Sequence, residues 1–297
     1  MLAILGPTAS GKSSLAIDVA EARSAAGDPT EIVAIDAFTV YRGMDVGTAK
    51  PDAAARARVA HHLIDVLDPA EALTVVRFRD LARTAIADVH ARGATPLLVG
   101  GSGLYWRAVV DDLAFPPTDP AVRRSVEQRY GDDRSAAHAE LERADPAAAA
   151  RIDARNMRRV VRALEVIELT GRRFSDWDDA WQRYESVYPD LEAALLDPPT
   201  DELRAAIAAR ARSMVADGLL GEVARLRAAP CSRTAAASIG VAEAEAVLDG
   251  RADEADLADA VAVRTLRYAR RQRAWFRADP RCVVTGPGEL LSRWGGA

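Results

Sequence analysis

The chain has 297 residues, of which 49% are hydrophobic and 28% charged, so it can bury a full core as one elaborated α/β domain or as two domains. No apolar run approaches the ~20 residues that span a bilayer, and Met1 leads into an apolar run without a basic leader, so we expect a cytoplasmic protein. The net charge of −5 argues against a protein that coats nucleic acid broadly, but it leaves room for a local basic groove.

The first predicted strand, residues 2–5, leads into the string GPTASGKS at 6–13 and then into a helix with periodic apolar residues. Strand, glycine-rich loop and helix in this order are the setting of a P-loop, whose backbone amides and helix N-terminus surround a polyphosphate. We expect the Lys12 ammonium to reach the outer phosphate and the Ser13 hydroxyl to bind a bridging Mg²⁺ ion. The alternative is a glycine-rich turn that caps an ordinary helix. The other residues of the predicted diphosphate- or nucleotide-binding loop are Gly6, Pro7, Thr8, Ala9, Ser10 and Gly11.

Lysine is rare in this chain, because only Lys12 and Lys50 are lysines among the 39 residues that are lysine or arginine. A compact ammonium suits a phosphate-binding loop better than the planar guanidinium of arginine. The lysine at position 12 therefore favours the phosphate-binding interpretation.

Short apolar runs then alternate with a helical pattern. We predict strands at 31–36 (EIVAID), 61–66 (HHLIDV) and 96–101 (PLLVGG), with a helix from Val75 to His90 before the last of them. Such alternation is typical of a parallel sheet with ligand sites at the carboxyl ends of its strands. The predicted fold class is therefore α/β, with a P-loop NTPase-like core in which helices flank a parallel sheet.

Proline clusters at 116–120 and 198–199 interrupt this pattern. The segment between them is alanine-rich and helical in pattern, which predicts a helical insertion. We assign residues 1–114 and 195–297 to the catalytic core with its C-terminal helices, and residues 115–194 to the insertion domain.

The remaining segment, 200–297, has the pattern of amphipathic helices that end in a short strand at 282–284 (CVV). Cys231 and Cys282 lie far apart and lack metal-ligand spacing, so we expect reduced structural thiols.

Two further segments place polar groups at predicted strand ends. Asp36 opens the string DAFTVYRGMDVGTAKP at 36–51, and we expect it to face the same crevice as the P-loop. Its carboxylate could act as a general base or hold Mg²⁺ through water, and the alternative is a helix or turn cap. In GGSGLYW at 100–106, glycines let the backbone approach a ligand, and Ser102 offers a hydroxyl donor.

Together these strings resemble the bacterial type of tRNA dimethylallyltransferase, also called tRNA isopentenyltransferase, of the IPP transferase family. The string at 36–51 is the most specific, since ordinary P-loop kinases have no counterpart. The resemblance covers nearly the whole chain and also rests on GPTASGKS (6–13), HHLID (61–65), GGSGLY (100–105), RALEV (162–166), TG (170–171), M-x-x-x-GLLGEV (214–223), SIG (238–240) and ARRQRAWFR (269–277).

The resemblance implies transfer of a dimethylallyl group from dimethylallyl diphosphate to the N6 amine of the adenosine 3′-adjacent to the anticodon. The implied tRNAs read codons that begin with U, and diphosphate is released. Asp36 matches the family's base, and Lys12, Ser102 and Arg210 match catalytic groups that stabilise the departing diphosphate. Mg²⁺ is the implied cofactor, the tRNA anticodon stem-loop is the implied partner, and we expect a monomer.

Basic residues gather in the C-terminal helix, where six arginines fall between Arg264 and Arg277. The alternative for this helix is a solvated arginine-rich face with core aromatics, and Arg162 could instead be a structural ion-pair partner. The tRNA-binding residues implied by the resemblance are Asp36, Ala37, Phe38 and Thr39 after the second strand, Arg123, Arg158, Arg159 and Arg162 in the insertion, and Arg270, Arg271, Gln272 and Arg277 in the last helix.

The chain departs from the family pattern at Ala37, where serine is usual, at Ser102, where threonine is usual, and at 241–242, where an aromatic and a basic residue are usual. Ser102 keeps the hydroxyl, whereas Val241 and Ala242 weaken any tRNA contact by that loop.

Three other functions stay open on the sequence alone. They are prenylation of free adenine nucleotide, phosphorylation of a small molecule by ATP, and nucleotide-gated binding without chemistry. A kinase is disfavoured because the strand ending at Val99 leads into Gly100 and Gly101 without an aspartate for Mg²⁺. We expect His61 and His62 to be structural.

Overall fold

The structure is a computed structural model that describes residues 1–177 and 179–295. The chain forms two compact units, which we call the core unit (Met1–Asp111 and Ser186–Ala297) and the helical unit (Asp112–Glu185). The core unit contains a parallel sheet flanked by helices, so the predicted α/β class is confirmed.

The sheet of the core unit has six parallel strands in the order β3-β2-β4-β1-β5-β6. Strand β1 lies between β4 and β5, with Leu5 opposite both Gly100 and Leu195, so the loop after β1 leaves from the middle of the sheet. The strands are β1 (Leu2–Leu5), β2 (Thr30–Ile35), β3 (His61–His62), β4 (Thr95–Gly100), β5 (Glu192–Leu195) and β6 (Cys282–Val284).

Two details of the sheet differ from the sequence prediction. Strand β5 belongs to the core unit, whereas the predicted insertion extended to residue 194; this apolar run is drawn into the sheet by pairing with β1. The predicted strand at 61–66 is wrong beyond its first two residues, because Leu63 and Asp65 adopt left-handed φ angles of 65° and 57° that end the extended pairing.

The two histidines of β3 have protein partners. His62 Nε2 lies 2.6 Å from a carboxylate oxygen of Glu31, and His61 Nδ1 lies 2.7 Å from the Val59 carbonyl oxygen. Within residues 1–177 and 179–295, no group of three or more His, Cys, Asp or Glu side chains is placed to hold a metal ion.

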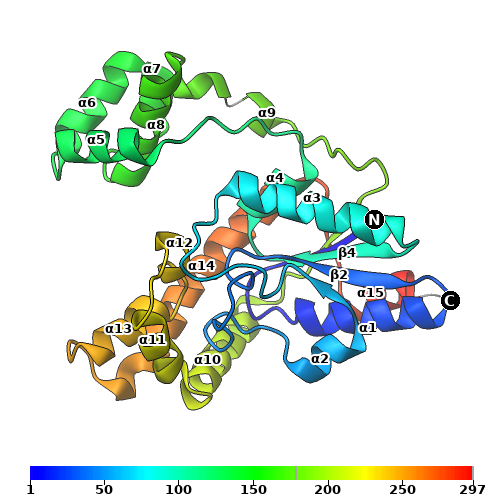
Figure 1. The fold of residues 1–297 in the computed structure, drawn as a ribbon. Helices are drawn as coiled ribbons and strands as arrows, with labels where there is room; N and C mark the ends of the chain where they lie inside the picture. The colour runs from blue at the N-terminus through cyan, green and yellow to red at the C-terminus, as the bar shows by residue number, and fades with distance from the viewer. Residues whose placement is uncertain (178, 296–297) are drawn as a thin grey trace. The chain divides into compact units, whose positions relative to one another are not determined.

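Alternate side chains of the strands enter two hydrophobic clusters, one on each face of the sheet. Leu2 and Ile4 pack with α1 (Lys12–Ala25) and α15 (Pro287–Trp294), whereas Ala3 and Leu5 face the cluster that includes residues of the other helices. Figure 1 shows α3 (Val75–Ala91) and α4 (Gly103–Val110) on one face of the sheet and α1 and α15 on the other. The remaining helices of the core unit are α2 (Ala53–Arg58), α10 (Thr200–Ala216), α11 (Leu219–Arg227), α12 (Arg233–Ala236), α13 (Val241–Leu248), the 3₁₀ turn η2 (Glu254–Asp256) and α14 (Leu257–Ala278).

The long helices α10 and α14 pack against each other and contribute Ile207 and Val261 to the cluster that contains Leu5. In the part of the chain that the structure describes, no helix is both long enough and apolar enough to cross a membrane. The expected helices after residue 200 and the strand at 282–284 are confirmed, but the segment does not end with that strand, because α15 follows it.

The helical unit has its own apolar cluster, formed by residues such as Val126, Leu141 and Val160. Its four main helices begin at an Asp or Asn side chain that accepts a hydrogen bond from a backbone amide, which satisfies donors that a helix start leaves free. Its elements are α5 (Pro120–Tyr130), α6 (Arg134–Ala144), α7 (Pro146–Ala149), α8 (Met157–Thr170), the 3₁₀ turn η1 (Phe174–Trp177) and α9 (Asp179–Gln182).

Candidate active site

The P-loop connects β1 to α1, as its sequence predicts. Gly6 cannot carry a side chain, because an added Cβ would lie 2.6 Å from the Leu196 carbonyl oxygen at the end of the neighbouring strand. Gly11 has a φ of 83°, and Ala9 adopts the same left-handed region with a φ of 64°. These conformations turn the chain tightly at the N-terminus of α1, where the helix dipole favours an anion.

Lys12 begins α1 and lies in a cationic environment. Its Nζ donates a hydrogen bond to the Pro7 carbonyl oxygen at 3.1 Å. Burial and the nearby charge of Arg210 lower the pKa of Lys12 to about 8, although the Asp36 carboxylate opposes this shift. Burial and the neighbouring cation thus disfavour the charged form of the ammonium, and an anion next to it would favour that form.

Arg210 approaches the same loop from α10. Its Nη1 donates to Thr8 Oγ1 at 3.2 Å, and burial lowers the pKa of the guanidinium. Residues at helical spacing on this face of α10 line the cavity together with it, and they are Ile207, Ala211 and Met214.

Gln272 of α14 joins the P-loop to the loop after β4. Its Oε1 accepts the Thr8 amide at 2.9 Å, and its Nε2 donates to the Gly101 carbonyl at 2.7 Å. An added Cβ on Gly101 would lie 2.3 Å from this Nε2, so the glycine is needed for the contact. Gln272 is 3% exposed, so this predicted tRNA-binding residue is buried inside the site, where it connects the P-loop to the loop after β4.

Tyr268 lies on the same face of α14 and was missed by the sequence analysis. Burial and the charge of Asp36 raise the pKa of its phenol, so it stays protonated at neutral pH. Val261, Thr265, Tyr268 and Gln272 all line the cavity at helical spacing, and this periodicity was the signal that could have revealed Tyr268.

Asp36 follows β2 and faces the P-loop cavity. Its Oδ1 accepts the amides of Phe38 at 2.8 Å and Thr39 at 3.3 Å, so the predicted turn cap is present. The cap does not remove Asp36 from the site, because the residue lines the cavity and its charge acts on Lys12 and Tyr268. The same carboxylate therefore has a fixed orientation and access to the cavity.

The cavity has a volume of about 140 Å³ and combines charged and apolar walls. Ile207, Met214 and Val261 supply apolar surface, and residues of the 36–51 string supply a further wall. The predicted site residues that the structure brings together in its lining are Thr8, Lys12, Ser13, Asp36, Phe38, Thr39, Arg210 and Gln272.

Other predicted residues lie outside the lining. Ser102 precedes α4 as its N-cap residue and is half-buried, so its contact with a leaving group stays a prediction. Ala37 is buried at 7% exposure. Arg270 and Arg271 are exposed on α14, and the Arg271 guanidinium lies 5.6 Å from the Tyr268 ring centroid. Arg277 forms an ion pair with Asp197 at 2.6 Å.

In the helical unit, the predicted arginines divide into two groups. Arg123 and Arg162 lie 2.7 Å and 3.0 Å from the Glu165 carboxylate, which is fully buried. The structural alternative for Arg162 is thus realised. Arg158 and Arg159 are exposed at the start of α8.

The family profile of the IPP transferases matches residues 39–279. The tRNA dimethylallyltransferase of Kineococcus radiotolerans is 48% identical over 287 residues, which cover 95% of this chain and 89% of that protein. The corresponding protein of Bifidobacterium longum subsp. infantis is 47% identical over 283 residues, covering 95% and 84%.

Solved structures agree with the sequence relatives. The full-length tRNA isopentenylpyrophosphate transferase of Bacillus halodurans superposes with a TM-score of 0.68 at 36% identity, covering 96% of this chain and 89% of that one. A eukaryotic dimethylallyltransferase acting on tRNA has the same fold, with a TM-score of 0.77 at 23% identity and coverage of 99% and 75%. By its sequence strings, its relatives and its fold, the chain belongs to the IPP transferase family.

Proposed function

We propose that this chain transfers a dimethylallyl group from dimethylallyl diphosphate to tRNA, at the N6 amine of the adenosine 3′-adjacent to the anticodon in tRNAs that read codons beginning with U. The observation that carries this proposal is one cavity in which the cations Lys12 and Arg210, the carboxylate of Asp36 and an apolar wall occur together. A kinase site also uses cations and a base, and a substrate with a hydrocarbon group next to a diphosphate uses the apolar wall beside them as well.

The P-loop stabilises the leaving group in this reaction. Cleavage of the allylic C–O bond develops negative charge on the departing diphosphate, and Lys12, Arg210 and the loop amides face that charge. Because an anion next to Lys12 raises its lowered pKa, substrate binding restores the full positive charge of the ammonium.

Asp36 removes the proton from the acceptor. The lone pair of the adenine amine is delocalised into the ring, so the new N–C bond forms efficiently only when a base takes a proton from the nitrogen. The amides of Phe38 and Thr39 hold the carboxylate in place for this transfer. The adenine must leave its stack to reach a half-buried carboxylate in this cavity, as bases do in enzymes that modify them.

We propose Mg²⁺ as the cofactor, with Ser13 as its protein ligand. Ser13 is exposed at the start of α1, next to Lys12, and it is one of the residues that line the cavity. This fits an ion that keeps several waters and takes one or two protein oxygens together with substrate phosphates. The ion, when bound, would neutralise charge on the diphosphate.

The exposed arginines support tRNA as the partner. Arg158 and Arg159 in the helical unit, and Arg270 and Arg271 on α14, are free to approach phosphates from solvent.

The test is incubation with labelled dimethylallyl diphosphate and either tRNA or AMP. We expect label in tRNA only, and its rate of appearance should fall by ~10²-fold or more when Lys12→Ala replaces the wild-type protein. Label in AMP would instead assign prenylation of free nucleotide. Phosphate transfer from ATP to a small molecule, without prenylation, would assign a kinase.

A further inference from the structure

One wall of the cavity is formed by a segment that has no regular secondary structure. Gly47, Thr48, Ala49 and Pro51 line the cavity, and we call residues 45–51 the wall segment. Such a loop has many backbone conformations available, so its shape in the site must be imposed by contacts.

The first contact is a carboxylate that binds three consecutive backbone amides. Glu222, in the first turn of α11, accepts hydrogen bonds from Asp45 N at 2.6 Å, Val46 N at 2.8 Å and Gly47 N at 2.9 Å. Its side chain is buried, and the residue is 5% exposed. Three charge-assisted bonds from successive residues fix the path of the chain through this turn.

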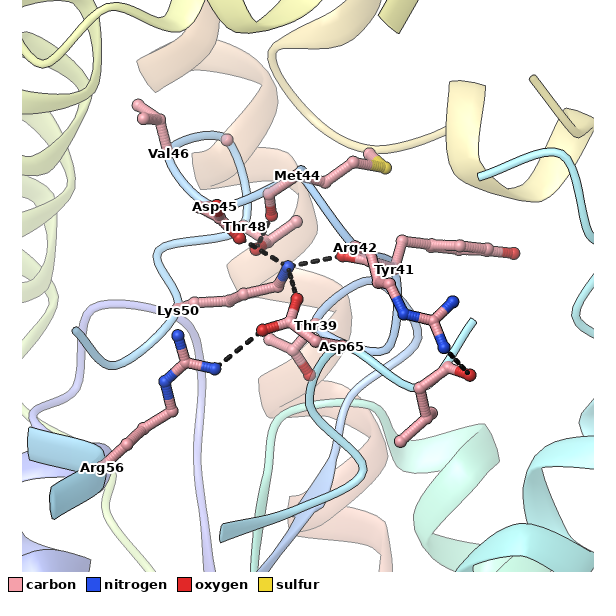
Figure 2. Close-up of polar contacts among 12 residues, drawn as sticks. Thr39, Tyr41, Arg42, Met44, Asp45, Val46, Thr48, Lys50, Arg56 and Asp65 are labelled. Carbon is pink, nitrogen blue, oxygen red and sulfur yellow. Dashed lines mark hydrogen bonds and ion pairs between the residues drawn. The ribbon is translucent and has the colours of Figure 1, made fainter. Parts of the chain in front are cut away.

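The second contact is the other lysine of the chain. Figure 2 shows Lys50 Nζ between the Asp45 carboxylate, at 2.7 Å, and the Asp65 carboxylate, at 2.6 Å, and it also donates to the Tyr41 carbonyl. The Lys50 side chain is 2% exposed, and Arg56 binds the second oxygen of Asp65 at 2.7 Å. The two ends of the wall segment are thereby tied together and tied to the segment after β3.

Backbone strain occurs at the same place. The described residues other than glycine that have positive φ angles are Ala9 in the P-loop, Ala49 in the wall segment, and Leu63 and Asp65 in the segment that Lys50 binds. Such conformations cost free energy and persist where surrounding contacts enforce them, which is common at functional sites.

We propose that Glu222 and Lys50 are positioning residues that hold the wall segment in the conformation needed for prenyl transfer. Neither side chain lines the cavity, so both act through the wall segment and not on substrate. The proposal rests on the proposed function. When the wall relaxes, bound substrates lose their alignment, so we expect the rate with bound substrates to fall more than the affinity for tRNA.

The test measures the single-turnover rate at saturating substrates, tRNA affinity and melting temperature for Glu222→Gln and Lys50→Met. Glutamine has one acceptor oxygen, and its NH₂ group opposes the backbone donors, so we expect the rate to fall by about 10- to 10²-fold with tRNA affinity unchanged. Lys50→Met keeps the length of the stem and removes the ammonium, and we expect a fall of the same order.

Gly47→Ala tests the same geometry while keeping both positioning residues. Its Cβ would lie 3.2 Å from Glu222 Oε1 and 3.2 Å from Leu219 Cδ1, so the wall must shift slightly, and we expect a smaller fall in rate without loss of fold. The matched control is Asp279→Asn, because Asp279 is a buried carboxylate of the core unit that accepts a backbone amide, from Arg281, but does not line the cavity. We expect this control to lose stability and keep the rate.

Unchanged single-turnover rates in folded Glu222→Gln and Gly47→Ala would overturn the proposal, and so would an effect confined to substrate affinity. If Glu222→Gln does not fold, the single-turnover rate of Gly47→Ala is the test: a reduced rate supports the proposal, and an unchanged rate overturns it. A wild-type protein that prenylates no tRNA would instead refute the proposed function, which keeps the two failures distinguishable.

Discussion

Positively charged side chains are arranged differently in the two units of this protein. In the core unit, Lys12 and Arg210 face a cavity, and burial lowers the pKa of both groups. In the helical unit, burial would raise the pKa of Glu165, but hydrogen bonds from Thr118, Arg123 and Arg162 outweigh it and lower that pKa.

The difference separates a binding site from a structural ion pair. The buried cations Lys12 and Arg210 would be stabilised by an anion that binds next to them. Arg123 and Arg162, in contrast, already form ion pairs with Glu165. A cluster of basic residues in a sequence is therefore not by itself evidence for a ligand.

Replacement of Asp36 should have the largest effect on activity. Asp36→Asn keeps the size of the side chain and the acceptor for the amides of Phe38 and Thr39, but it removes basicity. We expect the single-turnover prenylation rate to fall by ~10²–10⁴-fold, with tRNA affinity and melting temperature close to wild type. A near-normal rate would leave Asp36 as a turn cap only.

Lys12→Ala tests the role of the buried ammonium in the P-loop. It removes a charge that acts on the departing diphosphate, so we expect turnover to fall by ~10²-fold or more while tRNA affinity changes little. Arg293→Ala is a suitable control, because its guanidinium pairs with Glu192 and it does not line the cavity. Normal turnover in Lys12→Ala would contradict the role of the P-loop.

Arg270→Ala and Arg271→Ala test the exposed arginines of α14. If they contact phosphates, each change should weaken binding of all tRNA substrates alike and reduce the slope of log affinity against log salt by about 1. Binding titrations over a range of salt concentrations measure both quantities. Wild-type affinity and slope in both variants would show that this face is only solvated.

Arg162→Ala tests the structural arginine of the helical unit. It removes hydrogen bonds to Glu165 and to the Pro116 and Pro117 carbonyls. We expect a loss of about 1 kcal/mol in the free energy of unfolding, with tRNA affinity retained below the unfolding temperature. A loss of tRNA affinity at full stability would instead assign Arg162 to the RNA surface.

The pKa of Lys12 predicts a small proton uptake. Because this pKa lies near 8 in the free protein and rises next to an anion, diphosphate binding between pH 8 and 9 should take up a fraction of a proton. Calorimetry in two buffers with different ionisation enthalpies measures this uptake, and Lys12→Met should abolish it. Without ligand, the pKa of Lys12 is about 8 in the folded protein and has its ordinary value of 10.5 in the unfolded chain. Between these values the unfolded chain binds more protons than the folded protein, so the contribution of Lys12 to the free energy of unfolding should rise with pH above about 8.

Much of the fold and part of the site could be predicted from local patterns. The P-loop needs only a strand, eight residues and a helix start, and the strands at 31–36 and 96–101 are apolar runs of ordinary length. The position of Asp36 follows from the rule that parallel strands present their carboxyl ends at one edge. Strand β5 was harder to identify, because its short apolar run becomes a strand only when β1 is there to pair with it.

The sequence by itself determined the family, the strands β1, β2 and β4 and the P-loop with Asp36, because each of these is carried by a string of neighbouring residues. Only the tertiary structure decided that Gln272 braces Thr8 and that Glu222 and Lys50 hold the wall segment. It also showed that Arg162 and Arg277 are paired. The physical reason is that Gln272 lies 264 residues from Thr8, and Glu222 lies 177 residues from Asp45, so these hydrogen bonds exist only when packing of the core brings distant segments together.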